Sequence, residues 1–168
     1  MTLAEHLSEL FERLQPQCVL DVGANEGQYG RQLREIGYAG WIVSFEPVTD
    51  VFRSLDAAAD GDSRWLTFQL ALGNKTEVRE IAVTAESQLS SFFHRSRYSA
   101  EKLGEQGDVV HYEEVEVDTL ASWCRRYACE IPLDSPFLKV DTQGFDKEVL
   151  LGSASWSAAC PDSSSKRR

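Results

Sequence analysis

The chain has 168 residues, the length of about one domain, and 42% of them are hydrophobic, which is enough to build a core. Its charged fraction of 26% argues against disorder, and its net charge of −10 argues against nucleic acid as a partner, because phosphate binding requires a basic surface. No apolar run is long enough to span a membrane. The N-terminal segment lacks the basic and apolar regions of a signal peptide, so we expect a cytoplasmic protein.

The first part of the chain alternates helical and strand patterns. A helix is predicted at residues 2–14, where leucines and Phe11 recur on one face. Short apolar runs predict strands at 18–22, 41–45 and 65–71, and helical patterns lie between them at 26–36 and 48–58. This β-α-β-α-β order with short connections predicts a parallel sheet.

The pattern changes after the third strand. Residues 77–84 and 112–117 alternate in the manner of an antiparallel strand pair. The polar and aromatic segment between them has no clear period, and such segments are often lids or binding loops. A helix is expected at 119–128, a buried strand at 137–141 and a further helix from residue 145. We therefore expect one domain at 1–152 and a polar tail at 153–168.

Three acidic residues end predicted strands: Asp21, Glu46 and Asp141. Ligands of open parallel sheets bind outside the carboxyl ends of the strands, so these carboxylates are expected to face one crevice. Glu46 lies about two dozen residues beyond the glycine loop, where a carboxylate accepts hydrogen bonds from both hydroxyls of an adenosine ribose.

The glycine loop VLDVGANEGQYG restricts the choice of ligand. Dinucleotide sites have G-x-G-x-x-G, whereas Gly23 and Gly27 are spaced as G-x-x-x-G. Asp21 and Glu26 add negative charge beside the loop, which opposes a pyrophosphate. The charge suits the ammonium and sulfonium groups of S-adenosylmethionine, and the two glycines are expected to allow close approach of its methionine part. A nicotinamide-dependent oxidoreductase is therefore the weaker interpretation.

Several motifs in order resemble one enzyme family. DVGANEGQYG, SFEP, ALGN, the SS-F element at residues 90–92, VDTLASW and LKVDTQGFDKEVL follow the order seen in FkbM-type methyltransferases. The resemblance covers residues 18–152. It implies an α/β fold with a Rossmann-like class I methyltransferase sheet, helices on both faces and an antiparallel strand pair before the fourth core strand. It also implies S-adenosylmethionine-dependent methylation of a hydroxyl oxygen on a sugar or natural-product small molecule.

The resemblance also assigns roles by position. It implies that the methionine-side loop is formed by Asp21, Gly23, Asn25 and Gly27. Glu46 would hold the ribose, and Ala71 and Leu72 would lie along the adenine. Asp141 would face the transferred methyl group and act as a base or substrate orienter, although an Asp that caps the turn into the next helix is the alternative. No metal site is predicted, because Asp141 and Asp146 are too few ligands.

Further candidates lie in the polar segment. Ser90 and Ser91 are candidates for substrate hydrogen bonding and His94 for a general base, although surface loop residues are the simpler interpretation.

The chain departs from the family where further core strands are expected after residue 152. We therefore expect C-terminal strands to be missing, and a non-catalytic cofactor-binding remnant or interaction module is the alternative function. The strand at 137–141 would then be an exposed edge through which the protein self-associates.

Overall fold

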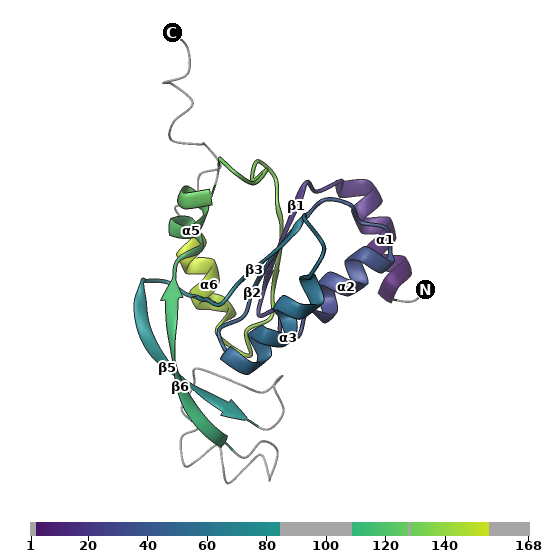
Figure 1. Ribbon diagram of the computed structural model, residues 1–168. Helices are drawn as coiled ribbons and strands as arrows, with labels where there is room; N and C mark the ends of the chain where they lie inside the picture. The colour runs from purple at the N-terminus through teal and green to yellow at the C-terminus, as the bar shows by residue number, and fades with distance from the viewer. Residues whose placement is uncertain (1–2, 85–108, 128, 155–168) are drawn as a thin grey trace.

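The protein was analysed as a computed structural model, which describes residues 3–84, 109–127 and 129–154 (Figure 1). The described helices are α1 (Leu3–Leu14), α2 (Gln28–Glu35), α3 (Thr49–Ala59), α5 (Leu120–Tyr127) and α6 (Asp146–Ser153). The described strands are β1 (Cys18–Val22), β2 (Trp41–Phe45), β3 (Trp65–Phe68), β4 (Ala71–Leu72), β5 (Glu77–Thr84), β6 (Val109–Asp118) and β7 (Phe137–Val140). Within these residues no helix combines the length and the apolar character that a membrane crossing needs.

A four-stranded parallel sheet forms the centre of the fold. Its order is β3-β2-β1-β7, and all three pairings are parallel. The parallel β-α-β-α-β unit predicted from the sequence is therefore confirmed. Strand order reverses beside β1, since β2 follows on one side and the later strand β7 lies on the other. Ligand sites of open α/β sheets lie at such a switch point.

Helices cover both faces of this sheet, as Figure 1 shows. Successive strand residues point to opposite faces. Val19 and Ile42 therefore pack with α1, α2 and α3, whereas Leu20 and Val43 pack with α5 and α6. Every residue of β1 is buried, which explains why its sequence is almost continuously apolar.

The third predicted strand is wrong in one respect. We expected one strand at 65–71, but β3 ends at Phe68 and β4 begins at Ala71. β4 leaves the central sheet and pairs in parallel with β6, in a second sheet of order β4-β6-β5. An apolar run cannot reveal that its two halves hydrogen-bond to different neighbours, because that depends on residues far along the chain.

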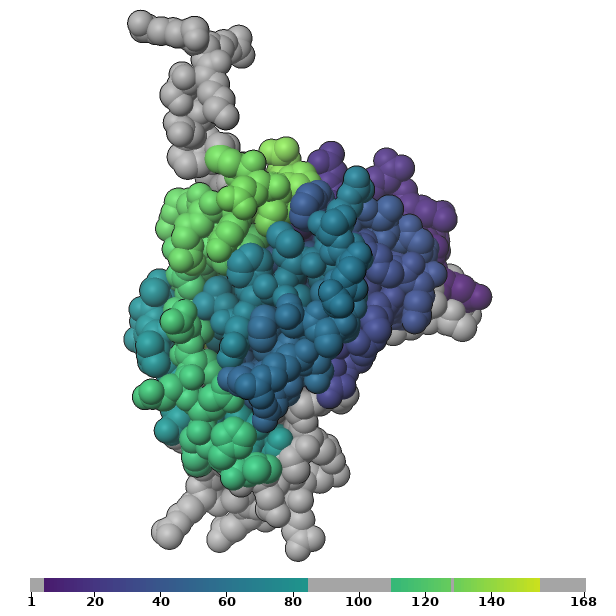
Figure 2. All heavy atoms as spheres, viewed as in Figure 1, coloured from purple at the N-terminus to yellow at the C-terminus, as the bar shows by residue number. Residues whose placement is uncertain are grey.

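The predicted antiparallel pair is present as β5 and β6, and it is longer than expected because β6 begins at residue 109. One face of the pair buries Ile81, Val83 and Val115 beside Val48. Glu113 of β6 accepts a hydrogen bond from the backbone N–H of Thr49, 3.0 Å away, at the start of α3. In Figure 2 the green surface of β6 accordingly lies against the blue surface of α3.

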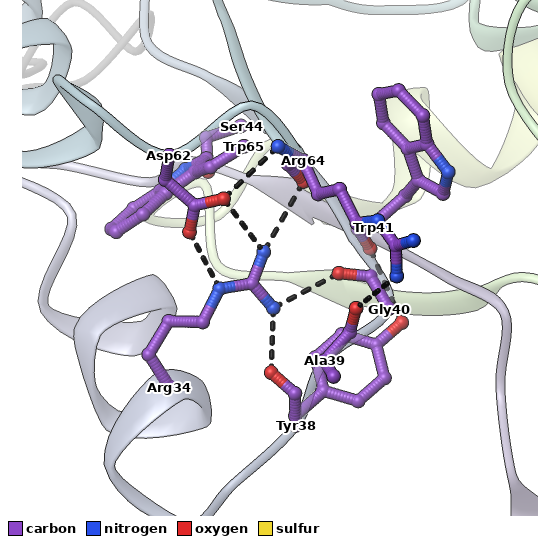
Figure 3. Close-up of polar contacts among 9 residues, drawn as sticks. All are labelled: Arg34, Tyr38, Ala39, Gly40, Trp41, Ser44, Asp62, Arg64 and Trp65. Carbon is purple, nitrogen blue, oxygen red and sulfur yellow. Dashed lines mark hydrogen bonds and ion pairs between the residues drawn. The ribbon is translucent and has the colours of Figure 1, made fainter.

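Arg34, near the end of α2, ties together the segments that enter β2 and β3 (Figure 3). Its guanidinium pairs with Asp62 at 2.7 Å. It also donates to the backbone oxygens of Tyr38, Gly40 and Arg64 at 2.6, 2.9 and 3.2 Å. The planar fork of an arginine can serve such divergent acceptors at once, which a lysine cannot do.

The C-terminal boundary lies close to the prediction. Helix α6 ends at Ser153, one residue beyond the expected limit of the domain. The rest of the predicted tail lies outside the described residues, so the proposed division at 152 stays a prediction.

Candidate cofactor site

A cavity of about 380 Å³ lies at the carboxyl ends of β1, β2 and β7. Its size falls within the range of roughly 300–1,000 Å³ for small-molecule and cofactor sites. The glycine loop, the start of α2, the Glu46–Val48 segment, β4 and the turn after β7 contribute to its wall. Of the predicted site residues, those that line it are Gly23, Asn25, Glu46, Ala71, Leu72 and Asp141.

Glu46 is the most strongly constrained carboxylate on this wall. Its side chain follows β2 and is buried, with 8% of the residue exposed. One oxygen accepts the backbone N–H of Asn25 and the other accepts that of Val48, each at 3.0 Å. Burial raises the pKa of Glu46 to about 7, although these two N–H groups favour the charged form. A carboxylate has about four lone-pair sites, so each oxygen keeps one for a ligand.

The backbone N–H groups of the glycine loop are already used within the protein. Gly23 and Ala24 both donate to the backbone oxygen of Phe45, at 3.1 and 3.0 Å. Asn25 donates to Glu46, and Glu26 donates to the Asn25 side chain at 2.8 Å. Gly27 donates to the backbone oxygen of Ala24 at 3.0 Å. The loop is therefore not the cradle of free N–H groups that binds a pyrophosphate.

The structure gives a packing reason for Gly23 and Gly27, and their expected role in making room for a ligand stays a prediction. Both residues have positive φ, at 72° and 83°. A Cβ on Gly23 would stand 2.1 Å from the backbone oxygen of Asp141, and one on Gly27 would stand 3.2 Å from the ring of Trp65. Gly27 does not line the cavity. These glycines serve the close packing of the loop against the end of β7 and against the core.

Asp21 also lies behind the cavity wall rather than on it. It is fully buried and pairs with Lys139, whose Nζ is 2.9 Å from one carboxylate oxygen. Ser44 lies 3.5 Å from the other oxygen. Burial raises the pKa of Asp21 above its ordinary value, and Lys139 opposes this shift.

Lys139 is a residue of the cavity wall that the sequence interpretation missed. It lies opposite Asp21 in the parallel register of β1 and β7 and lines the cavity. Its Nζ also donates to the backbone oxygen of Gly23 at 3.0 Å. A lysine between Leu138 and Val140, in a strand that the sequence predicts to be buried, is a usable signal, because an unpaired lysine is almost never buried.

Asp141 lines the cavity, 60% of its side chain is exposed, and its carboxylate lies 4.0 Å from Nζ of Lys139. The alternative role of capping the next turn belongs instead to Asp146. Its carboxylate accepts from the backbone N–H and the hydroxyl of Thr142 at 2.8 and 2.6 Å, and these bonds lower its pKa. Oδ1 of Asp141 accepts from the side chain of Gln143 at 3.5 Å, and its other oxygen is left available for a ligand on this wall.

The family model of the methyltransferase FkbM domain matches residues 21–160. The match covers most of the chain. The chain belongs to the FkbM methyltransferase family. No match was found to a curated protein or to a solved structure.

The predicted substrate residues of this FkbM methyltransferase, which are Ser90, Ser91 and His94, lie outside the described residues. Among the residues that the structure does describe, no cluster of three or more His, Cys, Asp or Glu side chains could hold a metal ion.

Proposed function

We propose that this FkbM methyltransferase binds S-adenosylmethionine in the cavity and methylates a hydroxyl oxygen of a small acceptor, a sugar or natural product. The observation that carries the proposal is the Glu46 carboxylate at the end of β2, held by two backbone N–H groups at 3.0 Å. Such a carboxylate is preorganised to accept the two ribose hydroxyls of an adenosine group.

The remaining wall fits the other parts of this cofactor. Leu70, Ala71, Leu72 and Ile81 form an apolar region beyond Glu46 that suits a purine ring. The acidic groups Glu46 and Asp141 on this wall favour a sulfonium cation over a phosphate. A dinucleotide fits less well, because the glycine loop has already used the N–H groups of residues 23–27.

The cofactor, when bound, supplies an electrophilic methyl group on its sulfonium sulfur. The protein's main contribution is to hold the acceptor oxygen in line with that group. Asp141 lines the cavity at the end of β7 with an exposed side chain, so it can orient the acceptor hydroxyl and receive its proton as the new bond to oxygen forms. Lys139 and Asp21 hold the glycine loop against β7 and so fix the distance between the cofactor side and the acceptor side.

Calorimetry with S-adenosylhomocysteine and with NAD tests the cofactor assignment. We expect S-adenosylhomocysteine to bind and NAD not to bind. Glu46→Ala should weaken S-adenosylhomocysteine binding by roughly 1.5–3 kcal/mol, the value of hydrogen bonds to a charged group. The matched control is Glu35→Ala, an exposed residue in the last turn of α2. Tight binding of NAD alone, or equal affinities for wild type and Glu46→Ala, would overturn the assignment.

Turnover with a panel of hydroxylated acceptors tests the reaction. Asp141→Asn should keep S-adenosylhomocysteine affinity while lowering kcat by about 10²-fold or more, the contribution of a general base. Cofactor binding without turnover on any acceptor would favour the non-catalytic cofactor-binding module.

A further inference from the structure

The order of the strands determines how the proposed ligand lies across the edge of the sheet. This inference rests on the proposed function. Glu46 follows β2, and the apolar wall of Leu70 and Leu72 lies beyond it on the side of β4. On the opposite side of β2 come β1 and then β7. A ligand with its ribose at Glu46 and its adenine near Leu72 therefore extends its amino-acid end across β1 to β7.

The amino-acid end of S-adenosylmethionine carries a carboxylate, which needs a donor at that place. The N–H groups of residues 23–27 are committed to protein acceptors, and so is the N–H of Thr142, which donates to Asp146 at 2.8 Å. Among the described residues that line the cavity, Lys139 is the only lysine or arginine.

Lys139 is also held in position for this task. An ammonium group has three N–H donors. One of them donates to the backbone oxygen of Gly23 at 3.0 Å, and Nζ also forms an ion pair with Asp21 at 2.9 Å. The carboxylate of Asp141 is 4.0 Å away, beyond hydrogen-bonding distance. Within the described part of the chain the ammonium group donates to no other oxygen, and it lies over the ring of Tyr29 at 5.7 Å, on the cavity wall.

The charges around Lys139 select the kind of anion. Asp141 lies beside the ammonium group, so a doubly charged phosphate would be repelled there. An α-amino acid carries a single negative charge next to an ammonium group, and this mixed pair matches a lysine beside an aspartate.

We propose that Lys139 binds the α-carboxylate of the cofactor's amino-acid end. The lysine thus contacts the cofactor directly, in addition to its pairing with Asp21. A purely structural lysine would influence every ligand of the cavity alike, whereas a carboxylate-binding lysine influences only ligands that carry this group.

A comparison of three ligands by calorimetry separates these roles. The ligands are S-adenosylhomocysteine, its decarboxylated analogue and 5′-methylthioadenosine, which lacks the whole amino-acid end. In the wild type, removal of the carboxylate should weaken binding at least about tenfold. In Lys139→Met the same removal should change the affinity less than about twofold. Lys147→Met, a change of an exposed lysine on α6, should behave as the wild type.

A second variant serves as the control for a loss of folding. Lys139→Met leaves Asp21 buried without its partner, which is often strongly destabilising. The double variant Asp21→Asn, Lys139→Met removes both charges and should show the same insensitivity to the carboxylate. Far-ultraviolet circular dichroism reports whether each variant is folded.

The outcomes distinguish the two proposals. If the wild type binds none of the three ligands, the proposed function fails. If it binds all three with equal affinity, or if Lys139→Met and the double variant still lose affinity when the carboxylate is removed, the carboxylate assignment to Lys139 fails while the cofactor assignment stands.

Discussion

Burial changes the acid–base behaviour of Glu46 on the cavity wall. Its pKa is raised to about 7, so the carboxylate changes its charge close to neutral pH. Tyr29 on the same wall does not titrate there, because burial raises its pKa to about 12. The charge of Glu46 therefore decides how well the cavity accepts ribose hydroxyls near neutrality.

We predict that affinity for S-adenosylhomocysteine rises by about tenfold between about pH 6 and pH 8, the range over which the ionised fraction of a group with a pKa near 7 grows tenfold. The sign follows from the raised pKa: protons must leave Glu46 before it can accept two hydroxyls, and they leave as the pH rises. Calorimetry over this range measures the effect. Glu46→Gln should bind S-adenosylhomocysteine more weakly than the wild type, with an affinity that does not change with pH. An equal pH dependence in both proteins would exclude Glu46 as its source.

At the scale of elements, Gly23 connects the glycine loop to β7. Its φ is 72°, and a Cβ there would stand 2.1 Å from the backbone oxygen of Asp141. Gly37 is the control position for Gly23, because its φ is also positive, at 87°, and a Cβ there would have no atom within 4 Å. The two glycines thus share the backbone conformation and differ in the space around it.

We predict that Gly37→Ala lowers the free energy of unfolding by about 1–2 kcal/mol, the cost of a left-handed conformation. Gly23→Ala should lower the free energy of unfolding by about 1–3 kcal/mol more than Gly37→Ala does, because the new methyl group forces the loop and β7 apart. Denaturant unfolding measures both. If the two losses are equal while only Gly23→Ala loses cofactor affinity, Gly23 acts at the ligand, as the sequence first suggested.

Arg34 connects α2 with the entries to β2 and β3, and its side chain is only 24% exposed. Arg34→Lys should lower the free energy of unfolding by about 1–2 kcal/mol, because the backbone oxygens of Tyr38 and Gly40 lose their donor. The control is Arg53→Lys, whose exposed pair with Asp50 should contribute less than about 0.5 kcal/mol. Equal losses would show that the Arg34 contacts add no stability.

At the scale of the whole molecule, the cavity lies at the carboxyl end of β1, a central strand of the parallel sheet. β1 is paired on both sides and covered on both faces, and its C-terminal end leads directly into the glycine loop. β7 pairs with β1 alone among the described strands, and its residues are half-buried. The cavity therefore lies between one strand that is paired on both sides and another that is paired on one side among the described strands.

We predict that the amides of β1 exchange with solvent most slowly and that those of residues 138–140 exchange faster. If β7 pairs with a second copy of the chain, protection at 138–140 should rise with protein concentration. Hydrogen exchange at two concentrations measures both effects. Equal and concentration-independent protection of β1 and β7 would contradict the proposed self-association.

The sequence alone predicted most of the elements. Apolar periodicity located the helices and the parallel strands, because burial of one face or of a whole strand leaves a local pattern. The same patterns placed Glu46 at the end of a strand and predicted the β5–β6 pair.

Only the tertiary structure decided what depends on contacts between distant residues. It separated β4 from β3, since pairing with β6 is set by residues more than 40 positions away. It placed Asp21 behind the cavity and Lys139 beside it, because the register of β1 against β7 brings these two charges together. It also showed that Gly23, which lines the cavity, packs closely against the backbone oxygen of Asp141. A sequence pattern records which side chains are buried, whereas the partner of each buried group is fixed only when the strands align.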